Sequence, residues 1–304
     1  MKNLRGYGMI VGAAVLWGAS ATLAKFLLNQ QMDTLLLVQT RAGFSCILMA
    51  LYFSVFSRHL LHVRAADLWR FALLGVFGLA GANFCYYFTI KESSVATAIT
   101  IQYTAPLFIM TFEVLRKEES FSAVKLVAAL LSLTGCFLTV TGFDLNVMKI
   151  TPIGLLTGIG SIFAFAFLTI YVRRMLVHYT VWTVTFYYIM FASIFWLLVY
   201  PPWNVASYNY SSGTWGALLL LAVASVLVPN LLYSGGLRYL VPSRAVITST
   251  LEPVVAIVTA AVFLGELITT VQALGAALVI LAIIILRLSQ EKMPTESFGG
   301  NHAT

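Results

Sequence analysis

A carboxylate inside an apolar stretch is the residue of this chain whose chemistry most needs an explanation. The stretch is LEPVVAIVTAAVFLGEL, residues 251–267, in which Pro253 follows Glu252 directly and Glu266 stands near the end. A carboxyl group among hydrocarbon is costly, and such groups usually face a cavity or a partner. Glu252 is therefore a candidate for proton coupling or for binding an ammonium group. The alternative is a structural pair with a nearby Tyr or Arg.

Two asparagine–tyrosine pairs share one spacing. Asn83 precedes Tyr86 by three residues, and Asn230 precedes Tyr233 by three, so each pair would share one helix face. Carboxamide and phenol groups in a common cavity suit recognition of a polar or zwitterionic solute. The alternative is packing, in which each Asn bonds a neighbouring backbone group and each Tyr fills a gap.

Four more side chains are candidates for the wall of such a cavity. Trp17 falls in the middle of an apolar run, where its ring could line a cavity or pack in the core. Arg41 could contact a substrate carboxylate or act as a gate, or its long side chain could reach the outer interface. Gln102 and Tyr103 complete the set of candidates.

Two prolines predict kinks in apolar helices. Pro106 and Pro253 each remove the backbone hydrogen bond to the carbonyl four residues earlier. The freed carbonyls belong to Gln102 and Ser249, and they could bind a solute or an ion. Neighbouring hydroxyls or water could equally satisfy them.

Two glutamates lie near predicted turns between helices. Glu119 and Glu266 could each accept hydrogen bonds from the free backbone amides at the start of the next helix. We therefore expect both to be structural caps.

The composition indicates which elements position these side chains. Of the 304 residues, 60% are hydrophobic and 10% are charged, and the mean hydropathy is +0.92, whereas a soluble domain carries about 25% charged residues. We expect an integral membrane protein whose apolar stretches of about 20 residues are spanning helices. Ten spans are predicted, at about 6–28, 33–56, 69–90, 94–115, 122–142, 151–173, 180–200, 213–236, 243–264 and 268–287. Residues 289–304 are predicted to be a disordered cytoplasmic tail.

The basic residues predict the orientation of these spans. Fourteen of the 18 Lys and Arg fall on the side of the N-terminus, and only Lys91 and Lys149 fall in loops on the other side. Basic loops stay in the cytoplasm, so both termini are expected there. The net charge of +7 thus indicates membrane orientation and not nucleic-acid binding.

The chain repeats itself at an offset of 147 residues. Four identities recur at this offset: Asn83 and Asn230, Tyr86 and Tyr233, Pro106 and Pro253, and Glu119 and Glu266. Two halves of five spans follow, residues 6–143 and 151–287. Because five is odd, the second half must be inverted. The loop with Arg58, Arg64 and Arg70 indeed corresponds to residues 201–212, which have no Lys or Arg. The predicted fold class is an all-α membrane protein of ten helices in two inverted five-helix repeats.

These motifs resemble a known family. WGAS at 17–20, an Arg early in the second span, and the stretches YTAPLFIMTFEVLRKEE and LEPVVAIVTAAVFLGEL are similar to EamA-type members of the drug/metabolite transporter superfamily. The resemblance covers about residues 6–287. It implies a carrier of ten spans with a central cavity, of a kind that mostly exports small metabolites such as amino acids.

The sequence therefore favours a secondary-active transporter that exports small polar metabolites by alternating access, in the inner (plasma) membrane of a bacterium. Alternatives are efflux of drugs or lipophilic cations, a facilitative channel and an uptake carrier. An enzyme is not expected: the four His lie in loops or the tail, and no H-E-x-x-H or G-x-S-x-G occurs. No Gly-Lys dipeptide is present for a Walker A loop. The expected partners are a small-molecule substrate, the lipid bilayer and protons for coupling, with no cofactor, metal or nucleic acid.

Overall fold

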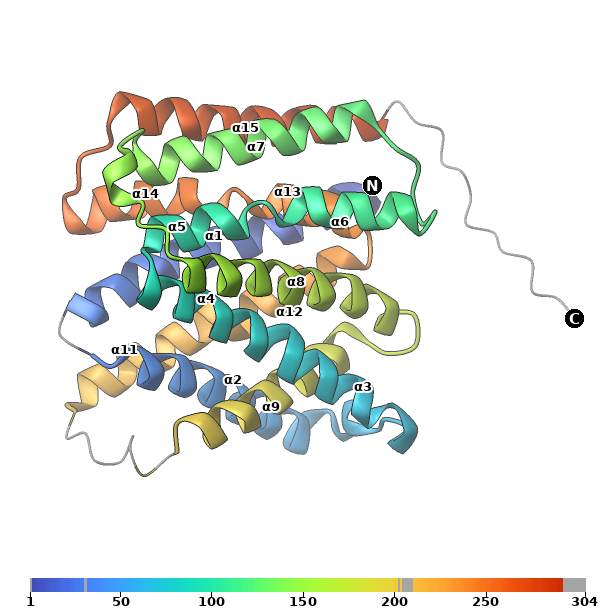
Figure 1. Cartoon of the computed structure of the whole chain (residues 1–304). Helices are drawn as coiled ribbons and strands as arrows, with labels where there is room; N and C mark the ends of the chain where they lie inside the picture. The colour runs from blue at the N-terminus through green and yellow to red at the C-terminus, as the bar shows by residue number, and fades with distance from the viewer. Residues whose placement is uncertain (1, 30–31, 202, 204–209, 292–304) are drawn as a thin grey trace, which may run out of the picture.

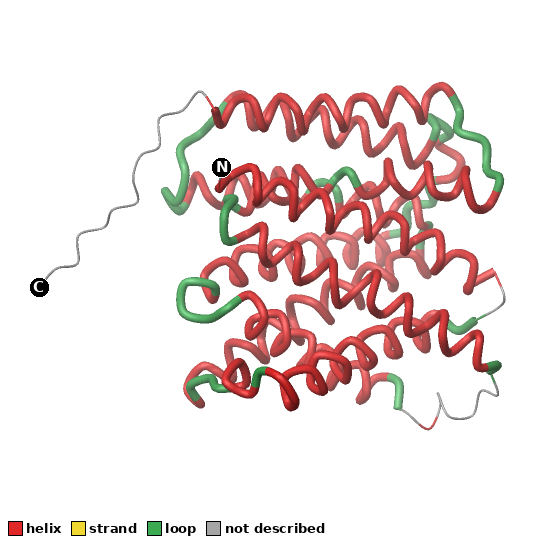
Figure 2. Tube along the Cα trace, turned by 180° about the vertical axis from the view of Figure 1, so that it is seen from behind, coloured by secondary structure: helices red, strands yellow, loops and turns green. Residues whose placement is uncertain are grey.

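Long apolar helices make up the protein, as the hydropathy pattern predicts. The computed structural model describes residues 2–29, 32–201, 203 and 210–291, and within these ranges ten helical segments are long and apolar enough to cross a membrane. Figure 2 shows that helices and short loops form the described chain. The predicted fold class is confirmed: the chain is an integral, multi-pass membrane protein of ten spans. Most of the predicted tail, residues 292–304, lies outside the described residues.

Each half contributes five spans with matching irregularities. The helices of the first half are α1 (Lys2–Asn29), α2 (Thr34–Phe56), α3 (Leu68–Leu73), the π-helical η3 (Leu74–Ala80), α4 (Gly81–Glu92), α5 (Val95–Gln102), α6 (Ala105–Leu115) and α7 (Ala123–Thr141), with short 3₁₀ turns η1 (Arg58–Leu61), η2 (Ala65–Asp67) and η4 (Leu145–Val147). The second half has α8 (Pro152–Met175), α9 (Val181–Val199), α11 (Ser212–Ala222), the π-helical η5 (Val223–Leu227), α12 (Val228–Leu237), α13 (Pro242–Ser249), α14 (Glu252–Leu264) and α15 (Thr270–Glu291). A π-helical segment thus interrupts the third span of each half, and a break divides each fourth span.

Polar side chains cap the N-termini of many of these helices. An N-terminal cap satisfies a backbone amide that has no partner within the helix. Six helices begin on a side chain that accepts such a bond: Asp33, Ser94, Ser122, Thr151, Thr180 and Ser211. Gly142 and Gly265 end α7 and α14 in the left-handed conformation, which glycine adopts without a steric penalty.

The two halves pack into each other rather than side by side. In both halves, the first span contacts the third and fourth spans of the other half: α1 lies against α12, α13 and α14, and α8 lies against α4, α5 and α6. The second spans, α2 and α9, pack together, and so do the last spans, α7 and α15, which run side by side at the top of Figure 1. Residues from both halves therefore meet around α1 and α8.

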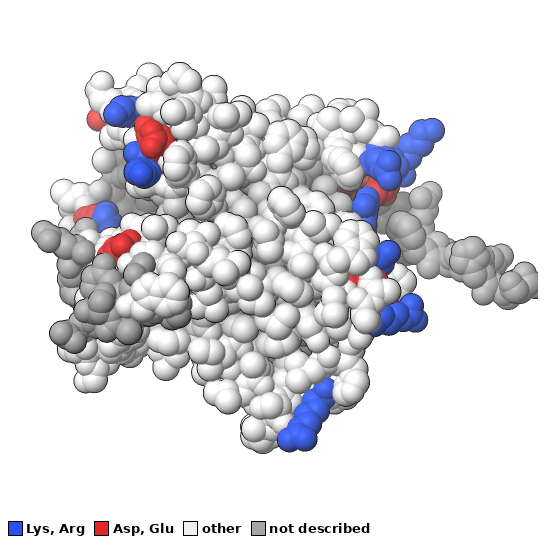
Figure 3. Space-filling model, turned by 60° about the horizontal axis from the view of Figure 1, so that its bottom comes forward, with Lys and Arg blue, Asp and Glu red and all other residues white. Residues whose placement is uncertain are grey.

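Charged side chains lie at the two ends of the bundle, and an uncharged belt separates them on the face that Figure 3 shows. We call the end at which α1 begins the basic end. Its exposed cations include Arg58, Arg64, Arg116, Lys117, Arg174 and Arg238. Because each half has an odd number of spans, α8 begins at the opposite end, which is the inversion that the charge pattern predicts.

The contact between α7 and α15 depends on two glycines that face each other. A Cβ atom built on Gly275 would lie 2.6 Å from the Thr139 backbone nitrogen and 2.7 Å from the Gly135 carbonyl oxygen. These are backbone atoms, so a side chain at this position must push the two helices apart.

We expect Gly275→Leu to lower the free energy of unfolding by about 1–3 kcal/mol, the usual cost of overpacking. The measurement is the thermal midpoint of the purified protein in detergent. Gly216→Leu is the matched control, because a Cβ on Gly216 meets nothing within 4 Å. Equal midpoints for the two variants would show that α7 and α15 do not need the close approach.

Candidate functional site

Glu252 is the first residue of α14 and follows the break in the ninth span directly. Its carboxylate lies close to the Tyr103 hydroxyl, and Tyr86 and Arg41 lie near enough to act on it electrostatically. The N-terminus of a helix carries partial positive charge, which favours a carboxylate there. The structure thus gathers around Glu252 three residues from the other half of the chain.

The tyrosine at 103 occupies the equivalent break in the fourth span, between α5 and α6. The two breaks are therefore equivalent positions of the repeat. Tyr103 lies at the first break, and Glu252 lies at the second. The prolines explain the breaks: Pro106 and Pro253 sit in the first turn of α6 and α14, where a residue without an N–H fits well. Among the described residues, no hydrogen bond engages the carbonyls of Gln102 or Ser249, and their role as ligands stays a prediction.

Arg41 reaches the same region from α2. Its Nη2 atom donates a 2.8 Å hydrogen bond to the Tyr87 hydroxyl, and the guanidinium lies over the Tyr87 ring at 5.5 Å from the centroid. Among the described residues no ion pair joins Arg41 to Glu252. A guanidinium has five N–H donors, so most of its capacity remains free. Tyr87 was missed by the sequence analysis, although the adjacent tyrosines at 86 and 87 were a signal.

The side chains around Glu252 keep accessible surface although protein surrounds them. Glu252, Tyr86 and Tyr103 lie deep in the bundle, yet each is only partly buried. Trp17 and Gln102 are partly buried as well. We name the group of Arg41, Tyr86, Tyr103 and Glu252 the central site.

Trp17 connects the central helix α1 to the second half. Its indole Nε1 donates a 3.0 Å hydrogen bond to the Ser225 carbonyl in the π-helical segment η5. Its ring lies 5.3 Å from that of Tyr233. A π-helical turn loosens the regular bonding of the helix, and the indole uses the carbonyl that this leaves accessible. Trp17 therefore has a structural contact in addition to its accessible face.

The asparagine–tyrosine pairs are not equivalent in the structure. Asn230 is 5% exposed and bonds the Val226 carbonyl at 2.7 Å and the Tyr188 hydroxyl at 3.1 Å. Tyr233 is 3% exposed and shares a 3.0 Å hydrogen bond with Thr169. The second pair thus has the packed arrangement that we considered as the alternative.

The first pair is more open. Asn83 and Tyr86 on α4 are both partly buried, and among the described residues no hydrogen bond engages the Asn83 amide. The repeat therefore predicts matching residues but not matching surroundings.

The two glutamates expected to be caps bind lysines instead. Glu119 Oε2 lies 2.7 Å from Nζ of Lys125, a lysine that is only 1% exposed. Glu266 forms an ion pair with Lys25. Hydroxyl residues take the capping positions: Ser122 begins α7, and Thr269 accepts a hydrogen bond from the Gln272 amide at the start of α15. A short hydroxyl side chain reaches the amide of its own turn more easily than a carboxylate several residues away, so the prediction of caps was wrong.

Buried ionisable groups fill the basic end of the bundle. Glu113 is 2% exposed and accepts a 3.3 Å hydrogen bond from the Ser243 amide, and Arg244 is 3% exposed and donates to the Leu286 carbonyl at 3.4 Å. Together with the buried Lys125, these contacts join α6, α7, α13 and α15. In this structure these contacts hold α6, α7, α13 and α15 together at the basic end.

Comparisons with known proteins agree with the fold. The model of the EamA-like transporter family matches residues 4–141 and again 152–288. The uncharacterized inner membrane transporter YicL of Salmonella typhimurium is 25% identical over 291 residues, 95% of this chain and 97% of that protein. The uncharacterized transporter YwfM of Bacillus subtilis is 27% identical over 293 residues, 93% of this chain and 94% of that protein. A solved crystal structure superposes with a TM-score of 0.75 at 17% identity, covering 96% of this chain and 99% of that one; it supports the fold.

Proposed function

Because the chain belongs to the EamA-like transporter family, we propose that it is a secondary carrier that moves small zwitterionic metabolites, amino acids among them, by alternating access. Its general role as a membrane transporter follows from the family and from its relatives. The observation that carries the finer proposal is the pair of opposite charges at the central site: Arg41 lies near enough to Glu252 to act on it electrostatically, and among the described residues no ion pair joins the two.

Opposite charges at membrane depth suit a zwitterion. A guanidinium binds a carboxylate through two parallel N–H donors, and a carboxylate binds an ammonium group. A solute that carries both groups would compensate Arg41 and Glu252 together, and neither charge would be left without a counter-ion in an apolar region. An anion or a cation alone would compensate only one.

The architecture supports alternating access. Inverted halves that cross at α1 and α8, and spanning helices that are broken in the fourth and ninth spans, are features of carriers that expose one site to each side in turn. The buried contacts of Glu113, Lys125 and Arg244 would close the basic end in one of the two states. We place that end in the cytoplasm on the distribution of Lys and Arg, and we expect net export on the resemblance to the family.

Efflux of lipophilic cations is the second candidate. The side chains of Tyr86 and Tyr103 lie near the one carboxylate of the central site, and aromatic faces attract organic cations. In that case Glu252 would bind the cation and Arg41 would have no part in recognition.

Substitution of Arg41 distinguishes the two candidates. In proteoliposomes, we expect Arg41→Gln to raise the KM for the transported amino acid about tenfold to a hundredfold, which is the effect of losing a charge-assisted hydrogen bond. Arg41→Lys keeps the charge and should lose less. Cationic esters of the same amino acid lack the carboxylate, so neither substitution should change their KM.

Arg116→Gln, at an exposed cation of the basic end, is the control for a general change of charge. If lipophilic cations such as tetraphenylphosphonium are transported and Arg41→Gln leaves all fluxes unchanged, the proposal of a zwitterionic substrate is wrong. A flux that stays linear in solute concentration would instead indicate a channel.

A further inference from the structure

A pocket of about 510 Å³ opens at the basic end, away from the central site. Its walls are the connection between α2 and α3, from the first half, and the connection between α8 and α9, from the second. Pockets that bind small molecules commonly have volumes of about 300–1,000 Å³. The volume therefore suits a small organic ligand.

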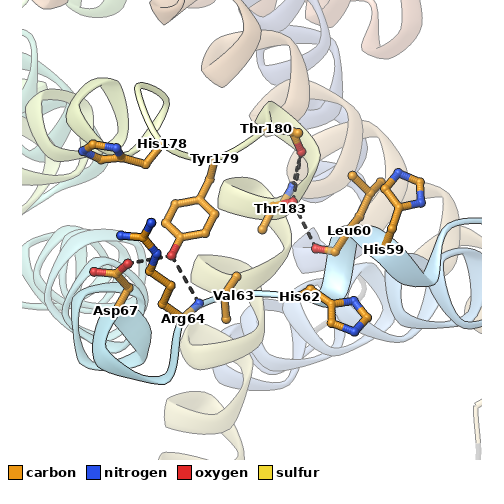
Figure 4. A pocket seen from close by; sticks show the side chains of 10 residues that line it. All are labelled: His59, Leu60, His62, Val63, Arg64, Asp67, His178, Tyr179, Thr180 and Thr183. Atoms are coloured by element: carbon orange, nitrogen blue, oxygen red, sulfur yellow. Dashed lines mark hydrogen bonds between the residues drawn. The ribbon is translucent and has the colours of Figure 1, made fainter.

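Hydrogen bonds hold the two walls together. Thr183 Oγ1 donates to the Leu60 carbonyl at 3.0 Å, and the Tyr187 hydroxyl donates to the Leu61 carbonyl at 2.7 Å. On the other side of the pocket, the Tyr179 hydroxyl accepts from the Arg64 backbone amide at 3.3 Å (Figure 4). The pocket is thus formed in advance, which lowers the cost of ordering it around a ligand.

The one acidic side chain of the lining is already engaged. Asp67 Oδ2 accepts a 2.6 Å hydrogen bond from the Tyr179 hydroxyl, and Oδ1 forms a 2.9 Å ion pair with Arg70. Burial and the hydrogen bond to Asp67 raise the pKa of Tyr179 above its ordinary value, so its hydroxyl stays a neutral donor. The carboxylate of Asp67 therefore has little remaining capacity for a cationic ligand.

The remaining polar groups of the lining are mainly N–H donors. Within the described residues, no hydrogen bond or ion pair engages the guanidinium of Arg64 or the rings of His59 and His178. In Figure 4, Arg64 and His178 lie on one side of the pocket, and His59 and His62 lie on the other. The imidazoles do not form a metal site: in the described ranges no three His, Cys, Asp or Glu side chains gather as metal ligands do.

From this arrangement we propose that the pocket binds the phosphate group of an organic ligand, with Arg64 and His178 as its principal donors. Guanidinium and imidazole N–H groups are the donors that recognise phosphate oxygens, and Arg can do so bidentately. The same chemistry is offered by the head group of an anionic lipid and by a soluble phosphate compound. Either would contact both walls and hold the two halves of the chain together at this end.

Binding can be measured without any transport assay, on the full chain purified in detergent. Inorganic pyrophosphate is the soluble probe, followed by isothermal titration calorimetry. We expect Arg64→Gln and His178→Gln each to weaken its binding by about tenfold. Arg238→Gln is the control, because Arg238 is an exposed cation at the same end but does not line the pocket.

The lipid arm uses nanodiscs of phosphatidylcholine alone or mixed with phosphatidylglycerol, and it measures the thermal midpoint. A stabilisation by phosphatidylglycerol that Arg64→Gln removes and Arg238→Gln retains would identify a lipid head group as the source. Pyrophosphate binding without this stabilisation would identify a soluble phosphate. If neither probe binds, or if Arg238→Gln weakens binding as much as the pocket variants do, the proposal is overturned.

Discussion

Replacing Glu252 with glutamine is expected to abolish uptake driven by a pH gradient while the protein stays folded. Glutamine has the same shape and can take the same position beside Tyr103, so the break between α13 and α14 should survive. The amide cannot bind or release a proton, and it carries no charge for an ammonium group. Uptake of radiolabelled solute into proteoliposomes, with and without an imposed pH gradient, is the measurement.

A second assay separates the two roles of Glu252. Exchange of solute at equal pH on both sides needs the binding site but no coupling. If the carboxylate couples protons, Glu252→Gln should keep exchange and lose accumulation against a gradient. If it binds the ammonium group, exchange should also fall, by about tenfold to a hundredfold.

Glu266→Gln is the control for this experiment. Its ion pair with Lys25 has side chains that are 51% and 46% exposed, and such exposed pairs contribute roughly 0–1 kcal/mol. Gradient-driven uptake and exchange at equal pH should therefore be the same for Glu266→Gln as for the unchanged protein. Full gradient-driven uptake by Glu252→Gln would remove Glu252 from the mechanism.

Substitution of Gly18 is expected to disable the central site although it changes none of the polar side chains of that site. A Cβ atom built on Gly18 would lie 2.5 Å from the Glu252 carbonyl oxygen and 3.0 Å from the Ala256 backbone nitrogen. These atoms belong to the first turns of α14 and cannot move without moving that helix. Gly18→Val should therefore displace Glu252 from Tyr103 and reduce transport to background, and overpacking should cost about 1–3 kcal/mol of stability.

Gly8→Val is the matched control, since Gly8 lies on the same helix and a Cβ there meets nothing within 4 Å. Transport rates and thermal midpoints of both variants are measured on the same preparations. Gly18→Ala should have a smaller effect in the same direction, because its single methyl already makes the close contact. Normal transport by Gly18→Val would show that the packing of α1 on α14 does not position Glu252.

Several features of the fold could be predicted because their signals are local in the chain. Hydropathy over about 20 residues marks each span, and the ten predicted spans agree with the ten helices within a few residues. The recurrence of Pro106 at Pro253 marked the fourth span of each half, and both are divided there in the structure. The π-helical segments η3 and η5 had no signal that we recognised.

The predictions that failed depended on partners that the local sequence pattern did not indicate. Glu119 and Glu266 lie near turns, as expected, but Glu119 pairs with Lys125 in the first turn of α7, and Glu266 pairs with Lys25 on α1. The identity of Asn83 with Asn230 suggested equal roles, but Tyr188 from α9 engages only the second. A repeat preserves positions along the chain, while the surroundings of each position depend on substitutions in every helix that packs against it.

The sequence by itself determined the membrane location, the ten spans and the inverted halves, because hydrophobicity, charge and repeated residues are properties of positions along the chain. Only the tertiary structure decided which polar groups meet. Arg41 on α2 bonds Tyr87 on α4 within the first half. Tyr103 lies close to Glu252, 149 residues away in the chain, because the two halves pack into each other. Such contacts join residues with no periodic relation in the chain, so they come from the packing of helices and from no pattern within any one of them.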